Sequence, residues 1–365
     1  MSVASADDMV TTPSDAAAPA ATAEPEPQQQ QQQQQQTASA PQKRKQLLMI
    51  SFDGAGPNPL WKKSMDIAAR SNAHFTYFLA CSLIIDRARA KTYQGPGEKP
   101  GRSNIGFAQT ADEARERLGH IWEAHLAGHE IGSHTCGHFD GKDWSEAEWL
   151  SELKTFRTTV GNAWADEGAA AKEPAGWKDF VMHDIRGFRA PYFSTSAGMI
   201  AAERKAGFVY DASAVTKGPA YPDMVSGTGA EKGDNKDADG MMLRFGLPLI
   251  PEGPSARPII GMDYNLYFRH SKATEDVANA ASYEDRAYRA FKAAFDRQYD
   301  GKRVPLQLGF HFVEMNGGAY WRAMEKLVTD VCLRDDVSCV SYSQAIEIMK
   351  KEGTITGPQG RRSGL

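Results

Sequence analysis

The sequence predicts an α/β protein folded as a distorted (β/α) barrel, and three observations lead to this fold class. Short apolar runs of strand length alternate with longer amphipathic stretches of helix length through most of the chain. Strands joined by helical crossovers pair in parallel, and this many units favours closure of the sheet. Polar residues directly follow several apolar runs, which is where such a barrel places its chemistry.

The predicted elements begin at residue 47 and follow one another with little interruption. We expect strands at 47–52, 74–80, 130–133, 185–188 and 305–310, with a further apolar stretch at 247–250. We expect helices at 58–71, 111–127, 145–164 and 283–299, and a final strand and helix that end near Lys351. Residues 217–240, rich in Gly, Asp and Lys, predict a long loop. The folded domain is therefore placed at 46–352.

The two ends of the chain differ in composition from this domain. Residues 1–45 are rich in Ala and Pro and contain an unbroken glutamine run, Gln28–Gln36, so we expect a disordered tail there. Residues 353–365 predict a flexible C-terminal tail. Ala4-Ser5-Ala6 has the small-x-small form of a signal-peptidase site, although no basic start or apolar stretch precedes it. Our hypothesis is export to the periplasm or the exterior, with a true start upstream; the alternative is a cytoplasmic protein.

Composition narrows the classes of partner. The chain of 365 residues has 41% hydrophobic and 24% charged residues and a formal charge of -4. Nucleic acid and anionic membranes need a basic footprint, so we expect no nucleic-acid partner. No run of about 18 apolar residues occurs, so we expect no membrane span.

The four cysteines predict different roles. Cys81 lies in an apolar run and is expected to be a buried core residue, whereas for Cys136, between two histidines, a structural role competes with metal ligation. Cys332 and Cys339 enclose a short polar loop and either form a disulfide or remain two thiols beside a turn. The bond would indicate an oxidising compartment.

The strongest chemical signal is the run from Gly128 to His138. His134 and His138 are four residues apart, and on a single helical turn this spacing puts both imidazoles on one face. Two neutral imidazoles in that arrangement suit zinc or a similar divalent ion. The strand predicted just before the pair strengthens the interpretation, while His129 in the same run is interpreted as structural.

Four more candidate site residues each follow an apolar run of the sequence. Asp53 precedes Gly54 and is either a turn aspartate or a carboxylate that faces the metal, where a catalytic zinc often takes its third ligand. His311 follows the strand at 305–310 and is either a buried structural histidine or an acid that protonates a leaving amine. Arg189 could fix a carboxylate through its rigid fork or form a loop salt bridge. Asp211 is the weakest candidate.

In this order the segments resemble the polysaccharide deacetylase (NodB-homology, carbohydrate esterase 4) family, over roughly residues 47 to 350. The run Gly128–His138 resembles the metal motif of the family, Arg189-Ala-Pro-Tyr192 its groove motif, Leu308-Gly-Phe-His311 the motif of the catalytic acid, and Ser51-Phe-Asp53 the first motif. The resemblance implies a distorted (β/α) barrel and hydrolysis of the acetamide of N-acetylglucosamine units, with release of acetate. It also implies that Asp53, Arg189 and His311 are catalytic, that Tyr192 binds substrate or an oxyanion, and that Asp53, His134 and His138 hold a divalent metal, expected to be zinc.

Two motifs depart from the family pattern. The family usually has two adjacent aspartates in the first motif, as base and metal ligand, whereas here Gly54 follows Asp53. Either Asp53 ligates the metal and shares the duty of base, which we favour, or it is the base and the metal is held by the histidines and water. Tyr210-Asp-Ala-Ser resembles a branch that includes cyclic-amide and ureide hydrolases.

Three functions remain open at this point. The first, and our prediction, is a metal-dependent deacetylase of an N-acetylglucosamine polysaccharide such as peptidoglycan, a chitin-like chain or an exopolysaccharide. The second is a hydrolase of a small amide or cyclic ureide on the same fold. The third is a non-catalytic carbohydrate-binding relative, which the presence of both histidines, Arg189 and His311 argues against.

Overall fold

Strand β1 (Gln46–Gly54) lies at the centre of a largely parallel sheet in the computed structural model, which describes residues 44–226 and 241–355. Every residue of β1 up to Asp53 is buried. A strand that is covered on both faces needs an almost continuous apolar sequence. For this reason β1 could be recognised from the sequence. β1 pairs in parallel with β2 (Thr76–Leu79), β9 (Leu306–His311) and β10 (Val337–Cys339).

The sheet continues from β2 through parallel neighbours and closes on itself near β9. The order is β2, β3, β4, β5 and β7, with β6 and β8 antiparallel to β7. The bounds are β3 (Glu130–Ser133), β4 (Gly187–Phe188), β5 (Tyr210–Thr216), β6 (Asp223–Ser226), β7 (Met241–Glu252) and β8 (Arg257–Ile260). The amide of Gly309 in β9 donates to the carbonyl of Gly261 at 2.9 Å, just after β8. This contact completes a distorted barrel and confirms the predicted fold class.

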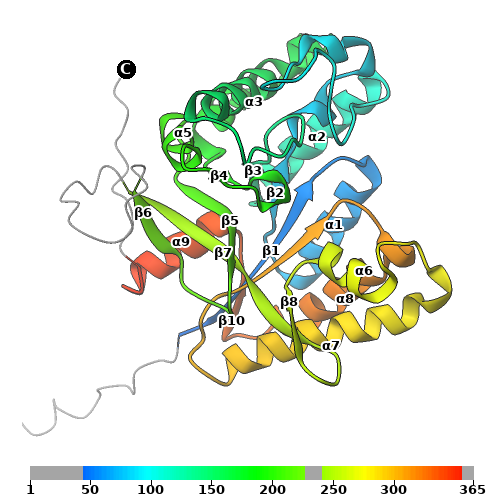
Figure 1. The fold of residues 1–365 in the computed structure, drawn as a ribbon, viewed down its shortest axis with the longest axis vertical. Coiled ribbons are helices and arrows are strands. Elements are labelled where there is room, and N and C mark those ends of the chain that lie inside the picture. The colour runs from blue at the N-terminus through cyan, green and yellow to red at the C-terminus, as the bar shows by residue number, and fades with distance from the viewer. Residues whose placement is uncertain (1–43, 227–240, 356–365) are drawn as a thin grey trace, which may run out of the picture. The chain divides into compact units, whose positions relative to one another are not determined.

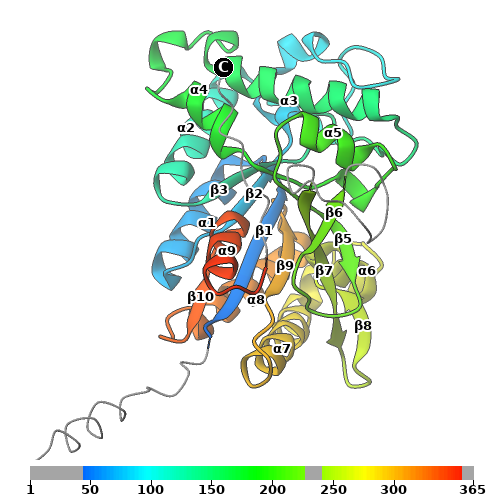
Figure 2. The same cartoon turned by 90° about the vertical axis from the view of Figure 1, so that its left-hand side faces the viewer.

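Helices cover the sheet between successive strands. Figures 1 and 2 show α3 and α5 together toward one end of the sheet, and α7 and α8 together toward the opposite end. Their bounds are α1 (Asn58–Ser71), α2 (Ala111–Leu126), α3 (Glu146–Asp166), α4 (Trp177–Asp179), α5 (Met199–Lys205), α6 (Asp263–Ser271), α7 (Ala280–Tyr299), α8 (Met315–Val331) and α9 (Tyr342–Lys351).

Local sequence explains where several helices start. α3 begins after Ser145, whose hydroxyl accepts from the amide of Glu148 while the Glu148 side chain accepts from the amide of Ser145. α9 begins with the same reciprocal pair, Ser341 and Gln344. These capping boxes satisfy amides that a helix start leaves unpaired, and the Ser-x-x-Glu/Gln pattern is readable from sequence.

The predicted elements and the observed ones differ in a few places. The apolar stretch at 247–250 is part of the longer strand β7, and the predicted loop 217–240 contains β6. The strand expected at 185–188 is reduced to two residues, because a π-helical turn, Phe180–Asp184, precedes it. α6 and α8 were not expected; aromatic residues dominate the first, and Asn316, Gly317 and Gly318 give the second a non-helical start.

All four cysteines form disulfides. Cys332 is bonded to Cys339, which is one of the two alternatives left open by the spacing. Cys81 is bonded to Cys136 across 55 residues of sequence, a pairing that the sequence did not indicate. Cys81 is buried as expected but is not a free core thiol, and the role of Cys136 is structural.

Some predictions fall outside the described residues. The tail predicted at 1–45 lies almost entirely there, as do residues 356–365 of the predicted C-terminal tail and residues 227–240 of the predicted loop. Within residues 44–226 and 241–355, no helix has the length and apolar character needed to cross a membrane.

Candidate active site

Asp53 ends the buried part of β1, at the carboxyl edge of the sheet. Its Oδ1 lies 2.8 Å from Nη1 of Arg189, and the Asp53 side chain is 5% exposed. Burial raises the pKa of this carboxyl, but Arg189 and the neighbouring histidines His134 and His311 outweigh burial and hold the pKa below its ordinary value. Asp53 is therefore an ionised carboxylate at neutral pH.

Arg189 follows β4 and is fully buried, with each guanidinium nitrogen engaged. Besides the bond to the strand-end carboxylate, it donates to the Ser51 hydroxyl at 2.9 Å, to the Tyr342 hydroxyl at 2.9 Å and to the Ala212 carbonyl at 3.1 Å. Its guanidinium also lies 4.3 Å from the ring centroid of Phe78. Arg189 thus fixes a carboxylate of the protein itself, that of Asp53. The Arg189 side chain is buried behind Asp53.

The two histidines of the strongest motif lie side by side, with ring centroids 4.9 Å apart. The expectation of a helical turn is wrong, because Thr135 and His138 adopt positive φ angles of 61° and 54° and the segment after β3 is a loop. Nδ1 of His134 donates to the carbonyl of Arg189 at 2.7 Å, so Nε2 carries the lone pair. The bend of this loop therefore brings the two imidazoles together, which we expected a helical turn to do.

Both imidazoles are neutral at physiological pH. Burial lowers the pKa of His134 in spite of the nearby Asp53 carboxylate, and burial and His134 together lower the pKa of His138 to about 3. Nδ1 of His138 is buried and has no hydrogen-bond partner among the described residues. Neutral rings with available lone pairs are the form in which histidine binds metals.

His311 is at the end of β9, and Asp263 at the start of α6 holds it. The Nδ1–H of His311 donates to Oδ1 of Asp263 at 2.7 Å, and the His311 amide donates to Oδ2 at 2.8 Å. Burial lowers the pKa of His311, but the charge and hydrogen bond of Asp263 and the charge of Asp53 raise it, and the net pKa lies above the ordinary value. Asp263 and Asp53 therefore favour the protonated form of His311.

Sequence reasoning missed Asp263, which is fully buried. A signal was available: Asp263 directly follows the apolar run Ile259-Ile260-Gly261-Met262, the same placement that singled out Asp53 and His311. Among the aromatic residues of α6 and α8, Tyr320 and Trp321 belong to the core, whereas Tyr264 and Phe268 are exposed.

These side chains face one cavity of about 780 Å³. Tyr192 lies at its edge, 58% exposed, with its ring centroid 4.9 Å from that of His138. The cavity thus brings together five of the six site residues predicted from sequence, and the sixth, Arg189, lies behind them. Its lining consists of Asp53, Ile105, His134, His138, Ala190, Tyr192, Phe193, Ile260, Met262, Tyr264, Asn265, Tyr267, Glu275, His311, Val313, Glu314 and Met315.

Other candidates lie elsewhere or do not assemble. Asp211 is buried in β5, where it accepts from the Ser213 amide at 2.9 Å and from Arg244 at 3.1 Å, so its role is structural. His129 accepts from the Phe75 amide at 3.0 Å and is structural, as expected. Within the described part of the chain, no group of three or more His, Cys, Asp and Glu side chains is arranged to hold a metal ion.

Comparison with known proteins gives structural similarity without sequence similarity. No protein-family model and no curated protein sequence matches the chain. A structure from Mycobacterium smegmatis, assigned as a polysaccharide deacetylase, superposes with a TM-score of 0.50 at 18% identity, over 90% of this chain and 97% of that one. A structure assigned as a polysaccharide deacetylase from Pseudomonas aeruginosa PAO1 gives a TM-score of 0.48 at 14% identity, over 85% of this chain and 92% of that one. A carbohydrate esterase 4 family pseudoenzyme from Bacillus anthracis gives 0.42 at 10% identity, over 82% and 65%.

The match to the Mycobacterium smegmatis structure covers nearly the whole of both chains. Because the sequence identity is only 18%, this match shows a shared fold. Because the match covers 90% of this chain, it extends over most of the described barrel. The described domain therefore has the fold of a polysaccharide deacetylase.

Proposed function

We propose that this protein is a hydrolase that removes N-acetyl groups from an N-acetylglucosamine-containing polysaccharide and releases acetate. The observation that carries the proposal is that one cavity holds a carboxylate with a lowered pKa, Asp53, and an imidazole with a raised pKa, His311. Two titratable groups whose surroundings push them into opposite proton states are suited to act as base and acid. The fold shared with the Mycobacterium smegmatis protein supports the same class of reaction.

The residues of the chain account for the proton transfers. Asp53 accepts a proton from the attacking water as the water oxygen bonds to the amide carbonyl carbon. His311, whose Nδ1 is held by Asp263, gives the Nε2 proton to the amide nitrogen as the carbon–nitrogen bond breaks. The net reaction converts one amide and one water into acetate and an amine. Arg189 keeps Asp53 ionised and oriented throughout.

We further propose that His134, His138 and Asp53 hold a divalent cation, which we expect to be zinc. The neutral imidazole pair and the unpartnered, buried Nδ1 of His138 fit this donor chemistry. Oδ1 of Asp53 already accepts from Arg189, which leaves Oδ2 as the freer oxygen for the cation. Among the described residues these three side chains do not form a ready-made three-ligand group, so binding of the cation has to draw them together. When bound, such a cation polarises a carbonyl group and lowers the pKa of water.

The cavity has the size and the aromatic surface to take a sugar chain. Among the described residues that line it, Glu275 and Glu314 add carboxylates to Asp53, and neither Lys nor Arg is present. A volume of about 780 Å³ lies within the range of ligand pockets, and the exposed rings of Tyr192 and Tyr264 offer flat faces on which sugars stack.

The test is acetate release from N-acetylglucosamine oligomers, measured together with bound metal. We expect stoichiometric zinc and acetate release in the wild type, and loss of both in His134→Ala. His183→Ala, which replaces an exposed histidine far along the chain from the loop, is the matched control and should behave as wild type. Unchanged acetate release in His134→Ala would contradict the proposed metal role, and hydrolysis of a cyclic ureide in preference to the oligomers would contradict the proposed substrate.

We also propose that the protein folds in an oxidising compartment, as an exported protein does. All four cysteines form disulfides, and such bonds persist mainly outside reducing compartments. Thiol titration of denatured protein isolated from its native cells should detect no free thiol. Four free thiols would indicate a reducing compartment instead.

A further inference from the structure

The segment His134–His138, which we name the histidine loop, has a backbone conformation that is unfavourable without support from other elements. Thr135 and His138 both have positive φ angles, of 61° and 54°. Residues other than glycine adopt this region rarely, and they stay there only where surrounding structure imposes it. The mutual placement of the two imidazoles therefore depends on contacts that the loop makes with other elements.

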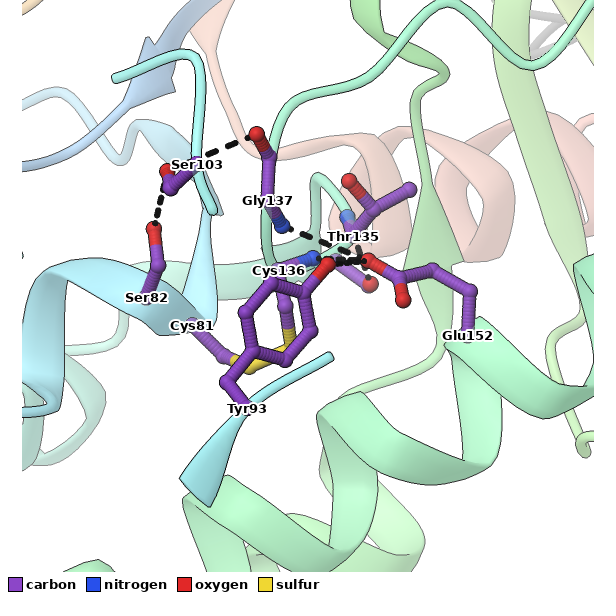
Figure 3. Close-up of a disulfide and its surroundings, with 9 residues drawn as sticks. Cys81, Ser82, Tyr93, Ser103, Thr135, Cys136, Gly137 and Glu152 are labelled. Atoms are coloured by element: carbon purple, nitrogen blue, oxygen red, sulfur yellow. Dashed lines mark hydrogen bonds between the residues drawn. A yellow bond between two sulfur atoms is a disulfide. The ribbon is translucent and has the colours of Figure 1, made fainter. Parts of the chain in front are cut away.

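One set of contacts comes from Glu152 on α3, a carboxylate that is 1% exposed. A single oxygen, Oε1, accepts from the amide of Cys136 at 2.9 Å, from the amide of Gly137 at 3.3 Å and from the hydroxyl of Tyr93 at 2.8 Å. Figure 3 shows these three donors converging on it. Two consecutive buried amides of the loop thus have a side chain as their partner, and its removal would leave them unpaired at considerable cost.

The second set of contacts lies on the other side of the histidine loop. The Cys81–Cys136 disulfide ties the middle of the loop to the 3-10 turn η1 (Cys81–Ile84), which follows β2. The amide of Cys81 also donates to the carbonyl of Thr135 at 3.0 Å, and the amide of Ser82 to the carbonyl of Cys136 at 3.3 Å. Both cysteines are fully buried, so a reductant in solvent does not reach the bond in the folded protein.

Close packing also restricts the conformation of the histidine loop. A Cβ at Gly137 would overlap the Phe139 ring and the Tyr93 hydroxyl, so this position admits only glycine without a shift. The hydroxyl of the same Tyr93 donates to Glu152 (Figure 3). The carboxylate, the tyrosine and the disulfide thus enclose the loop between α3 and η1.

We propose that Glu152 and the Cys81–Cys136 disulfide are positioning groups for the metal site: they hold the histidine loop in the bend that brings the His134 and His138 imidazoles together. This inference rests on the proposed function for its chemical consequence, but its structural content stands on the loop alone. Neither group lines the cavity, so both act only through the two histidines. Outer groups that orient metal ligands typically change affinity by about 10- to 100-fold when removed.

The variants that test this are Glu152→Ala, Glu152→Gln and the double variant Cys81→Ala/Cys136→Ala. Glu152→Gln keeps an oxygen that accepts from both amides, so it should retain zinc affinity within about threefold of wild type. Glu152→Ala and the cysteine double variant should each lose at least about tenfold. Zinc alone is the probe, and a chromophoric chelator competes for it.

The second disulfide provides a matched control. Cys332→Ala/Cys339→Ala removes a bond at the end of α8, away from the cavity. It should lower the thermal midpoint yet leave zinc affinity within about threefold of wild type. Equal losses of zinc affinity in the two double variants would show that affinity only follows general stability and would overturn the proposal.

Hydrogen exchange of the peptide that contains residues 133–139 separates this inference from the proposed function. If the wild type binds no zinc, the proposed metal role fails, while faster exchange of this peptide in Glu152→Ala than in Glu152→Gln still supports the positioning role. Equal exchange in wild type and a folded Glu152→Ala overturns it. Should Glu152→Ala not fold, Glu152→Asp takes its place, because it keeps the charge but withdraws the carboxylate from the two amides by one methylene.

Discussion

At the scale of single residues, the site depends on one buried ion pair. Asp53 and Arg189 are both almost completely buried and lie 2.8 Å apart, with Arg189 further bonded to Ser51 and Tyr342. Removing one member of a buried pair leaves the other charge without compensation, whereas removing both does not. The pair therefore matters for stability as well as for catalysis.

Arg189→Met is expected to destabilise the fold by about 3–5 kcal/mol, because Asp53 then remains buried and unpaired. The double variant Asp53→Asn/Arg189→Met should recover part of that loss. Urea denaturation of the wild type, both single variants and the double variant measures the coupling. Strictly additive losses would show that the two side chains do not stabilise each other.

The proton state of His311 depends on Asp263. Activity that needs ionised Asp53 and protonated His311 should be bell-shaped in pH, with the alkaline limb set by the raised pKa of His311. Asp263→Asn removes the negative charge that favours the imidazolium, so the pKa falls and the alkaline limb should move by about one unit toward lower pH. The rate of acetate release against pH measures this. Asp276→Asn, which neutralises an acidic residue in the segment after α6, should leave the limb in place.

At the scale of elements, α5 is packed on the sheet through a buried acid. Glu203 is fully buried, and neither carboxylate oxygen has a hydrogen-bond partner among the described residues. Burial and the nearby Asp211 carboxylate raise its pKa well above the ordinary value, in spite of Arg244. The folded protein therefore takes up a proton that the unfolded chain has already lost at the same pH.

The sign of the pH dependence follows from this difference. Between the unfolded pKa of about 4.5 and the raised folded pKa, the native state binds more protons, so stability falls as pH rises. Glu203→Met removes the acid and keeps most of its volume, and it should stabilise the protein at pH 8 by about 1–3 kcal/mol. Thermal midpoints of both proteins at pH 5 and pH 8 test this; an unchanged difference between the two pH values would show that Glu203 is not responsible.

At the scale of the whole molecule, the two disulfides should contribute unequally to stability. In the chain-entropy view, the bond that spans 55 residues restricts the unfolded chain more than the bond that spans 7. We expect about 4 kcal/mol for Cys81–Cys136 and about 2 kcal/mol for Cys332–Cys339. Denaturant unfolding of the two cysteine-to-alanine double variants measures the order. A larger loss for the shorter loop would show that native-state contacts, and not chain entropy, determine the contribution.

The barrel could be predicted from the sequence because its strands are covered on both faces. β1 and β9 read as apolar runs that end in Asp53 and His311, and the capped helices α3 and α9 begin at recognisable Ser-x-x-Glu/Gln patterns. α6 and α8 could not be predicted, since aromatic residues at the first and glycines at the start of the second weaken the helical pattern.

The sequence by itself thus determined the fold class and five of the residues that line the cavity, because strand ends and histidine spacing are local features. Only the tertiary structure decided which groups meet. Asp263 reaches His311 across 48 residues, Arg189 reaches Asp53 across 136, and Cys81 bonds to Cys136 across 55. Contacts between distant segments leave no periodicity in the chain, since they arise when separate strands deliver their ends to the same edge of a closed sheet.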